Sequence, residues 1–378
     1  MTRQLRCVIM RGGTSKAVFL READIPAEPE ARKRVILAIY GSPDTRQIDG
    51  LGGADPLTSK LAIIGPPRRA DTHLTYTFGQ VEIGHPEIDW RSLCGNISAA
   101  VGAFAVYEGM VTPTAPITVV RAYNTNLERV LSIEVPVENG RPLERGDYTV
   151  PGVPGSGARI LIDFADTAGG ATGRLLPTGN AVDTLEVPGF GPLEVSLVDI
   201  GNAHVFLRAR DVGLAGTETA AEIDAKSHLR TLLERIRGLA AERMGMIGDA
   251  ARSAQDTPAT PLLAMVSPPA EYCSALAGGS VAAEAVDLVS RLMFMQQMHK
   301  TYAGTSTVCT GVAARLAGTL VQQVARPHNR TAIRIGHPAG VIETESEIGP
   351  DGQVLRATLG RTARRILEGY VFVPKAAA

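Results

Sequence analysis

The chain has 378 residues, more than a single hydrophobic core usually holds, so we expect two domains of similar size. Hydrophobic residues make up 44% of the chain and charged residues 20%, a balance typical of a folded globular protein. The formal net charge of −1 and the aromatic content of only 4% argue against a nucleic-acid-binding surface.

Membrane and export signals are also absent from the sequence. No run approaches the roughly 18 consecutive apolar residues that a membrane-spanning helix needs. The amino-terminal segment lacks the basic start, apolar stretch and small-residue cleavage site of a signal peptide, so we expect a cytoplasmic protein. The cysteines contain no CxxC pair and predict neither a metal site nor a disulfide framework.

In the first half of the chain, closely spaced glycines and prolines predict many short strands joined by tight turns. Helical periodicity predicts one helix over 30–40 and a second over 94–107. The second segment is rich in alanine and almost without polar side chains, so we expect it to be buried on most sides. Apolar or alternating runs predict strands at 6–10, 17–20, 61–64, 74–81, 117–123, 130–135 and 159–164.

The second half repeats this pattern, with strands around one apolar helix. Helices are predicted over 221–244, 282–298 and 304–316, the last being apolar and rich in small residues. We place the domains at 1–184 and 185–378, with the terminal strand able to return to the first domain. Strands are predicted at 193–200, 205–209, 331–335 and 342–348.

Four segments combine glycine with small polar residues: RGGTSK, GGADPLTSK, CGN and AGTS, which begin at Arg11, Gly52, Cys94 and Ala303. Backbone amides at a glycine-rich turn or a helix amino terminus bind anions, so several such segments fit a substrate with several carboxylates. Glycines that merely form turns explain any single segment, but four together favour a binding role. None is a P-loop, and no GxGxxG follows a strand, so no nicotinamide cofactor is predicted.

Cys94 is the strongest single catalytic candidate, because it begins an apolar helix and helix amino termini favour the thiolate form of cysteine. A thiol can then remove and return a carbon-bound proton. The competing interpretation is an inert buried cysteine, which we expect for Cys7 and Cys309. Lys60 closes a glycine-rich segment and could act as an acid or base if desolvated, although most lysines are solvated surface charges.

The seven histidines do not form a metal-binding set, because no HxxxH or HExxH occurs. His204 and His299 are candidate substrate contacts, and each is equally consistent with a structural role. No nucleophile-elbow motif indicates a serine hydrolase.

Six motifs resemble the PrpF family over nearly the whole chain: MRGGTSK, GSPDTRQIDGLGGADPLTSK, LCGN, LLPTGNA, DIGNAHV and HPAG. That family includes 2-methylaconitate cis-trans isomerase, methylitaconate delta-isomerase and 4-oxalomesaconate tautomerase. The resemblance implies an α+β, diaminopimelate-epimerase-like fold. In that fold, two similar domains each have a curved, mostly antiparallel sheet around a central helix, and the active site lies in the cleft between them. It also implies that no metal, flavin or nicotinamide takes part.

The resemblance assigns the catalytic roles to Lys60 and Cys94. Diaminopimelate epimerase uses a second cysteine, and Ala303 stands at the matching position here, which disfavours a two-thiol racemase. Lys60 would then be the partner acid or base, or would stabilise an enolate. His299 is predicted to bind substrate because it lies just before the second apolar helix, and the other binding residues follow from the resemblance. The predicted substrate-binding residues are Gly13, Thr14, Ser15, Gly52, Gly53, Ser59, Gly95, Asn96, Gly179, Asn180, Asn202, His299, Gly304 and Thr305.

We therefore predict a cofactor-independent isomerase that catalyses an allylic 1,3-proton shift or a cis-trans isomerisation of an unsaturated di- or tricarboxylate. The substrate would be of the 4-oxalomesaconate or 2-methylaconitate type. The alternatives are an amino-acid racemase or epimerase, or a non-catalytic polycarboxylate-binding protein that would not need Cys94 or Lys60. The expected partner is a small polycarboxylate, and neither a nucleic acid nor a membrane is expected as a partner. The sequence does not decide whether the protein forms a homodimer.

Overall fold

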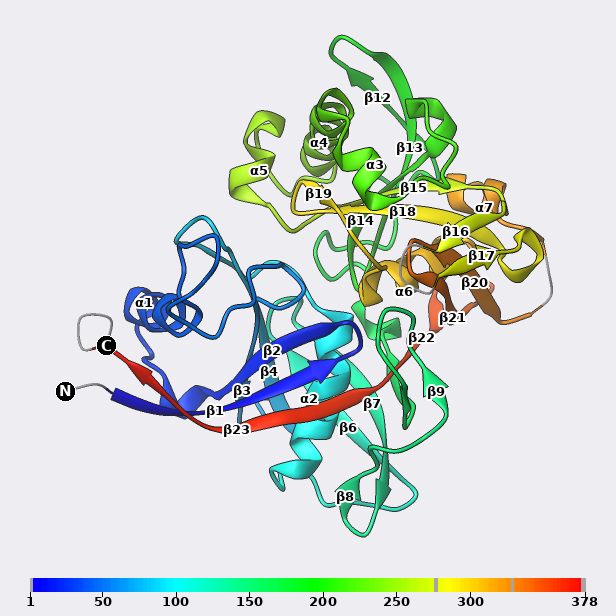
Figure 1. The fold of residues 1–378 in the computed structure, drawn as a ribbon. Helices are drawn as coiled ribbons and strands as arrows, with labels where there is room; N and C mark the ends of the chain where they lie inside the picture. The colour runs from blue at the N-terminus through cyan, green and yellow to red at the C-terminus, as the bar shows by residue number, and fades with distance from the viewer. Residues whose placement is uncertain (1–2, 275–277, 328–329, 375–378) are drawn as a thin grey trace. The chain divides into compact units, whose positions relative to one another are not determined.

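The computed structural model describes residues 3–274, 278–327 and 330–374, which form an α+β fold (Figure 1). The chain divides into two compact units: Met1–Ile162 with Arg361–Ala378, and Asp163–Gly360. The predicted division between residues 184 and 185 therefore falls inside the second unit. The reason is that β12 (Asp183–Val187) pairs with β13 (Gly191–Ile200) and is part of the second unit's sheet.

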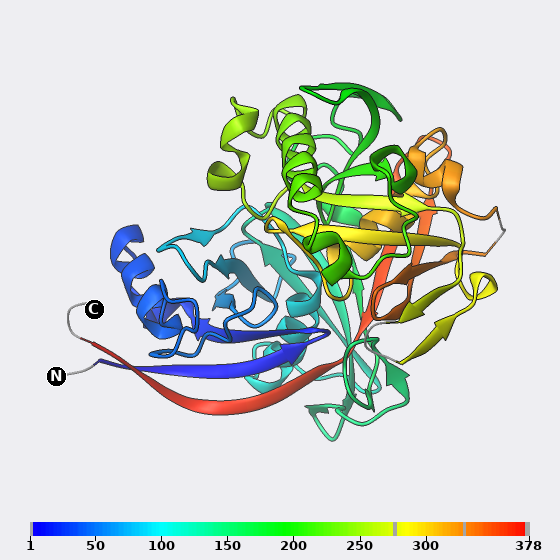
Figure 2. The ribbon, with the colours of Figure 1, turned by 45° about the horizontal axis from the view of Figure 1, so that its top comes forward.

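The sheet of the first unit has the strand order β23–β1–β2–β3–β4–β6–β7. Neighbouring strands are antiparallel except in the β2–β3 and β4–β6 pairs. The terminal strand β23 runs beside β1, as Figure 2 shows. The strands are β1 (Arg3–Gly12), β2 (Ser15–Arg21), β3 (Lys60–Gly65), β4 (Leu74–Val81), β6 (Ile117–Asn124), β7 (Arg129–Glu138) and β23 (Ala363–Val373).

Helix α2 (Gly95–Tyr107) is the central helix of this unit and contacts strands from both ends of the sheet. All its residues from Gly95 to Val106 are buried, as its apolar sequence predicts. The close packing depends on small side chains, since a Cβ on Gly102 would lie 2.5 Å from a methyl carbon of Ile133. Helix α1 (Pro29–Tyr40) packs into a separate core of the same unit.

The second unit repeats this topology in the order β12–β13–β14–β15–β18–β20–β21–β22. The parallel pairs fall at equivalent places, β14–β15 and β18–β20, and α4 and α6 occupy the chain positions of α1 and α2. This shared order supports the repeat that the sequence only suggested. The elements are β14 (Asn202–Arg208), α4 (Ser227–Arg243), β15 (Leu262–Ser267), β18 (Leu288–Phe294), α6 (Gly304–Ala313), β20 (Ala332–His337), β21 (Gly340–Ile348) and β22 (Val354–Arg361).

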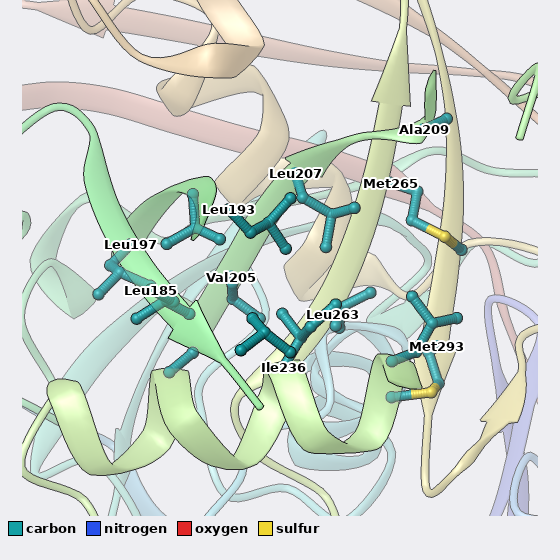
Figure 3. Packing of buried hydrophobic residues seen from close by; sticks show 14 of the residues in the cluster. Leu185, Leu193, Leu197, Val205, Leu207, Ala209, Ile236, Leu263, Met265 and Met293 are labelled. Carbon is teal, nitrogen blue, oxygen red and sulfur yellow. The ribbon is translucent and has the colours of Figure 1, made fainter. Parts of the chain in front are cut away.

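One face of this second sheet packs on α4, and Figure 3 shows the leucine, valine and methionine side chains that fill the space between them. The remaining short elements are β5 (Ile88–Asp89), β8 (Arg141–Pro142), β9 (Tyr148–Thr149), β10 (Ser156–Gly157), β11 (Ile160–Asp163), α3 (Ala220–Asp224), α5 (Ser253–Asp256), β16 (Tyr272–Ser274), β17 (Gly279–Val281), β19 (Gln297–Met298) and α7 (Leu320–Val324). None of the helices in the described part of the chain is both long and apolar enough to cross a bilayer.

The predicted helix over 282–298 is wrong, because most of this segment forms the strands β18 and β19. Strand β18 lies inside the sheet between β15 and β20, so both of its faces are buried, and its sequence LVSRLMF is apolar except for the buried Ser290 and Arg291. A short apolar run of this kind does not distinguish a buried strand from a buried helix. The predicted helix over 221–244 also breaks, into α3 and α4.

An ion-pair cluster holds the carboxyl end of α2. Glu108 is the C-cap residue, and its side chain, only 7% exposed, accepts hydrogen bonds from Arg6, Arg21 and Arg365 at 2.8–3.0 Å. Burial alone would raise the pKa of Glu108, but the hydrogen bonds from Arg6 and Arg21 outweigh it and lower the pKa to about 2. A carboxylate is disfavoured at a helix carboxyl end, so these guanidinium groups are needed to stabilise it.

We expect Glu108→Gln to lower the free energy of unfolding by about 3 kcal/mol at neutral pH, because three arginines lose a buried partner. The folded-state pKa lies below the ordinary value of 4.5, so the carboxylate stabilises the fold above that pH. This contribution is lost as the pH falls toward 2, and the variant should therefore be less sensitive to acid than the wild type. Urea unfolding at a series of pH values measures both effects.

Glu87→Gln is the matched control, because Glu87 is exposed and makes one ion pair with Lys33. Its effect should stay below about 0.5 kcal/mol. Equal acid sensitivity of Glu108→Gln and the wild type would contradict the expected role of Glu108.

Candidate active site

The amino end of α2 combines a thiol with the backbone amides of a first helical turn. Cys94 is the N-cap residue and is partly exposed, and its side chain makes no capping hydrogen bond. The first turn of a helix leaves its amides without intrahelical acceptors, and they and the helix dipole attract an anion. The thiol of Cys94 therefore lies where a bound carboxylate would also be held.

Hydrogen bonds from Asn96 connect the turn between β1 and β2 to the amino end of α2. The Asn96 Nδ2 donates to Thr14 Oγ1 at 3.0 Å and to Ser15 Oγ at 3.3 Å. Gly13 has φ +49°, and a Cβ there would lie 2.3 Å from Asn96 Oδ1, so only glycine permits this approach. The Gly13 amide itself donates to the Thr362 carbonyl at 2.9 Å, so the hydroxyl groups of Thr14 and Ser15 are the better candidates for substrate contact.

Lys60 is the first residue of β3 and is only 4% exposed. Its Nζ donates to Gln80 Oε1 at 2.5 Å and lies 5.4 Å from the centre of the Phe78 ring. Burial lowers the pKa of Lys60, while negative charge on Cys94 and Asp55 acts in the opposite direction. The Coulombic interaction between Lys60 and Cys94 means that the two groups lie close enough to influence each other electrostatically.

The loop before Lys60 is packed so tightly that two of its positions have no room for a side chain, which explains why they are glycines. A Cβ on Gly52 would lie 2.2 Å from Gln47 Cδ, and a Cβ on Gly53 would lie 2.1 Å from Thr58 Oγ1. Ser59 is buried and donates to Gln47 Oε1 at 2.7 Å. The Gly52 amide donates to the Tyr40 carbonyl at 3.2 Å, so in this structure it is already engaged. The loop therefore positions Lys60.

The second unit builds a matching arrangement at the amino end of α6. The N-cap residue is Ala303, and again no side chain caps the helix. Thr305 holds the place in α6 that Asn96 holds in α2, and its Oγ1 accepts a hydrogen bond from Asn202 Nδ2 at 3.0 Å. Gly201 has φ +69° in the turn beneath, and a Cβ there would lie 3.2 Å from Thr305 Cβ. The structure thus places Ala303 at the equivalent of Cys94.

His204 is fully buried beside this turn, and burial lowers its pKa to about 4, so the ring is neutral at physiological pH. Its Nδ1 lies 2.9 Å from the Asn202 carbonyl, which can only accept, so Nδ1 carries the hydrogen. The Nε2 must then accept from Ser306 Oγ at 2.7 Å. His204 therefore anchors the first turn of α6 instead of being exposed to a ligand.

Three further predicted binding residues make hydrogen bonds within their own segments. Gly179 and Asn180 are exposed, and the Asn180 side chain donates to Asp183 Oδ1 at 3.0 Å. The Gly179 amide donates to the Leu176 carbonyl at 2.9 Å, and the Asn180 amide donates to Thr178 Oγ1 at 3.3 Å. His299 is buried and accepts a hydrogen bond from the Thr301 amide at 3.1 Å.

Two residues that contact Lys60 and Asn96 were not predicted. Gln80 stands opposite Lys60 in the β3–β4 pair and binds the carbonyls of Pro56 and Ser59, each at 3.2 Å. Arg361 is 1% exposed and donates from Nε to Asn96 Oδ1 at 2.7 Å. The only sequence signal that could have placed Gln80 beside Lys60 is the register of its strand. No sequence signal could have placed Arg361 beside Asn96, because the two residues are 265 positions apart.

Among the residues that the structure describes, no group of three or more His, Cys, Asp and Glu side chains is placed to hold a metal ion. The groups here that we predict to move protons are the Cys94 thiol and the Lys60 amine.

A profile of the family described as PrpF protein matches residues 2–374. The chain belongs to the PrpF family. Its relatives include a 3-methylitaconate isomerase from Eubacterium barkeri, 51% identical over 100% of this chain and 99% of the relative. A 2-methyl-aconitate isomerase from Shewanella oneidensis is 39% identical over 97% of this chain and 96% of the relative.

Solved structures agree with this PrpF assignment. The crystal structure of a methylitaconate-delta-isomerase superposes with a TM-score of 0.84 at 50% identity and covers 100% of this chain and 97% of that one. A hydroxyproline epimerase from Agrobacterium vitis has a TM-score of 0.59 at 9% identity, with 99% and 94% coverage, and so shares the fold alone. These likenesses confirm the predicted diaminopimelate-epimerase-like fold class.

Proposed function

We propose that this PrpF-family chain is an isomerase that moves a proton, and with it a double bond, in a small unsaturated di- or tricarboxylate without a cofactor. The observation that carries the proposal is the pairing of Cys94, at an uncapped helix amino end, with the buried Lys60. A carboxylate-binding helix end beside two proton-transfer groups fits an allylic proton shift. The names of the relatives support the same reaction class.

In the proposed mechanism, a substrate carboxylate binds at the first turn of α2, near the hydroxyl groups of Thr14 and Ser15. One group of the Lys60–Cys94 pair removes the allylic proton, and the electron pair enters a dienolate whose negative charge develops on the carboxylate. Amides and an ammonium group already in place stabilise that charge without reorganising. Return of a proton to the distal carbon completes the shift, and rotation about the central bond before that step gives a cis-trans change.

We propose methylitaconate as the first substrate to test, because the relative named for it is more similar than the relative named for 2-methylaconitate. The position of the active site in a cleft between the domains stays a prediction, as do the catalytic roles of Lys60 and Cys94 and the binding roles of the other predicted residues.

A racemase acting on amino acids is the competing enzyme. Ala303 at the N-cap of α6 disfavours it, because the amino end of α6 then has no thiol at the position equivalent to Cys94. A non-catalytic polycarboxylate-binding protein could use the buried Lys60 to pair with a carboxylate, but it would have no need for the Cys94 thiol.

Deuterium incorporation tests the proposed function. The protein is incubated in D₂O with methylitaconate, 2-methylaconitate, 4-oxalomesaconate and trans-aconitate separately, and each reaction is followed by proton NMR. We expect isomerisation with deuterium entering at the newly protonated carbon for one of the four. No exchange with any of them would leave the family and fold intact and favour a binding protein.

A further inference from the structure

We propose that Gln80 is a positioning residue whose neutral carboxamide holds the Lys60 amine in place for proton transfer. This inference rests on the proposed function and adds a residue that none of the six family motifs contains. It applies whether Lys60 gives or takes the proton, because a carboxamide oxygen accepts a hydrogen bond from a neutral amine and from an ammonium group alike.

Strand pairing brings the two side chains together. Lys60 is the first residue of β3, and the antiparallel register of β3 and β4 puts Gln80 directly opposite it. Side chains of directly opposite residues lie on the same face of a sheet. Gln80 is fully buried and Lys60 is 4% exposed. The Lys60 Nζ donates to Gln80 Oε1 at 2.5 Å, so the contact is direct and excludes water.

The carboxamide of Gln80 can adopt only one orientation. Its Nε2 lies 3.2 Å from the carbonyl oxygens of both Pro56 and Ser59. Carbonyl oxygens only accept hydrogen bonds, so the amide nitrogen must face them and Oε1 must face Lys60. The Ser59 carbonyl also accepts from the Val81 amide at 3.1 Å, which connects the loop before Lys60 to β4. The backbone of this loop therefore fixes the oxygen to which Lys60 donates.

Phe78 supplies a second contact from β4. It lies two residues before Gln80, so both side chains are on one face of the strand, and the Lys60 Nζ lies 5.4 Å from the centre of its ring. The Tyr40 hydroxyl donates to the Lys60 carbonyl, and it stays neutral because burial raises the pKa of Tyr40. Lys60 is thus held at its backbone and at its amine.

The neutrality of Gln80 and Phe78 matters for the chemistry. An amide oxygen and an aromatic ring orient an amine without adding a full negative charge. A carboxylate in the place of the Gln80 amide would favour the ammonium form and compete with the negative charge that develops on the substrate. Burial lowers the pKa of Lys60, and the titratable groups that oppose this lowering are Cys94 and Asp55. Gln80 therefore orients the amine and leaves its charge to these groups and to the substrate.

Titration of Lys60 by NMR tests the inference on the full chain. The chain has six lysines, so labelling lysine with ¹³C at Cε gives few signals, and Lys60→Met assigns the signal of Lys60. Gln80→Glu puts a carboxylate beside the amine and should raise the titration midpoint of Lys60 by about one pH unit or more. Gln80→Met removes the acceptor and should lower the midpoint, because the ammonium loses a hydrogen bond. A residue that only supports the fold would not shift the midpoint in opposite directions.

Turnover gives a second readout. Gln80→Met should lower kcat by about 10- to 100-fold and leave KM within about twofold, because a misplaced amine slows proton transfer more than it weakens binding. Gln297→Glu is the matched control, since it makes the same chemical change at an exposed glutamine on β19. It should leave both the Lys60 midpoint and kcat in place.

A Lys60 midpoint that moves in the same direction in both variants, or in neither, would overturn the proposal. If only one variant folds, the sign of its shift decides. Failure of both to fold would also overturn it, because Gln80 would then be needed for the fold and not for Lys60. The titration needs no turnover, so a wild type inactive on all four substrates would refute the proposed function, while the midpoints still decide whether Gln80 controls Lys60.

Discussion

Replacing Cys94 with alanine should lower kcat/KM by about 10³-fold or more on the substrate that the deuterium experiment identifies. General acid–base groups contribute typically 10²–10⁴-fold, and Cys94 is one of the two proposed proton-transfer groups. Deuterium exchange into the substrate should fall in parallel, because the same proton is moved. The fold should be preserved, since Cys94 makes no side-chain capping bond to α2. NMR progress curves in H₂O and D₂O measure both losses.

Cys273→Ser is the matched control for the thiol substitution. Cys273 is exposed on the β16–β17 hairpin, and its replacement should leave kcat/KM within about twofold. Turnover by Cys94→Ala at more than a tenth of the wild-type rate would show that the thiol is not the proton-transfer group. The reaction would then have to proceed through Lys60 alone.

Lys60→Met should lower kcat by about 10²–10⁴-fold, because it removes the second proton-transfer group and the cation closest to the developing charge. Thermal stability at neutral pH should be retained or increased, since the variant replaces a buried cation with an apolar side chain of similar length. A loss of activity without a loss of stability separates a catalytic role from a structural one. Steady-state kinetics and thermal unfolding on the same preparation make the comparison.

The pH dependence of the wild type follows from the same residue. If Lys60 acts as the ammonium, activity falls as the pH rises through its pKa, and burial lowers that pKa below 10.5. The alkaline limb of kcat should therefore begin at a lower pH than for a solvent-exposed lysine. Lys33→Met, which removes a lysine from α1 paired with Glu87, should not move that limb. An alkaline limb that persists in Lys60→Met with its remaining activity would assign it to another group.

Local features of the site were readable from the sequence. The apolar run after Cys94 predicts a buried helix, and the structure begins α2 at Gly95 with Cys94 as its N-cap. Lys60 likewise begins a strand, directly after its glycine-rich loop. Both predictions depend on patterns within about ten residues, over which periodicity and turn chemistry act directly.

Other local patterns were incomplete or, in one case, misleading. The segment over 282–298 reads as a helix, yet β18 is a strand because it is enclosed between β15 and β20. The glycines at 52 and 53 predict anion-binding amides, which stays a prediction, and the structure adds close contacts with Gln47 and Thr58 that the sequence did not indicate. In both cases the neighbours that decide the outcome are contributed by the tertiary fold.

What the sequence by itself determined is therefore the chemistry available: one thiol at a helix start, one lysine after a tight loop, and glycine turns beside both. Only the tertiary structure decided which groups act together. It brought Gln80 against Lys60, and Arg361 against Asn96 from 265 positions away. It also buried Lys60 and neutralised His204 by desolvation. The physical reason is that burial and charge coupling depend on distance in space, which sequence spacing does not encode.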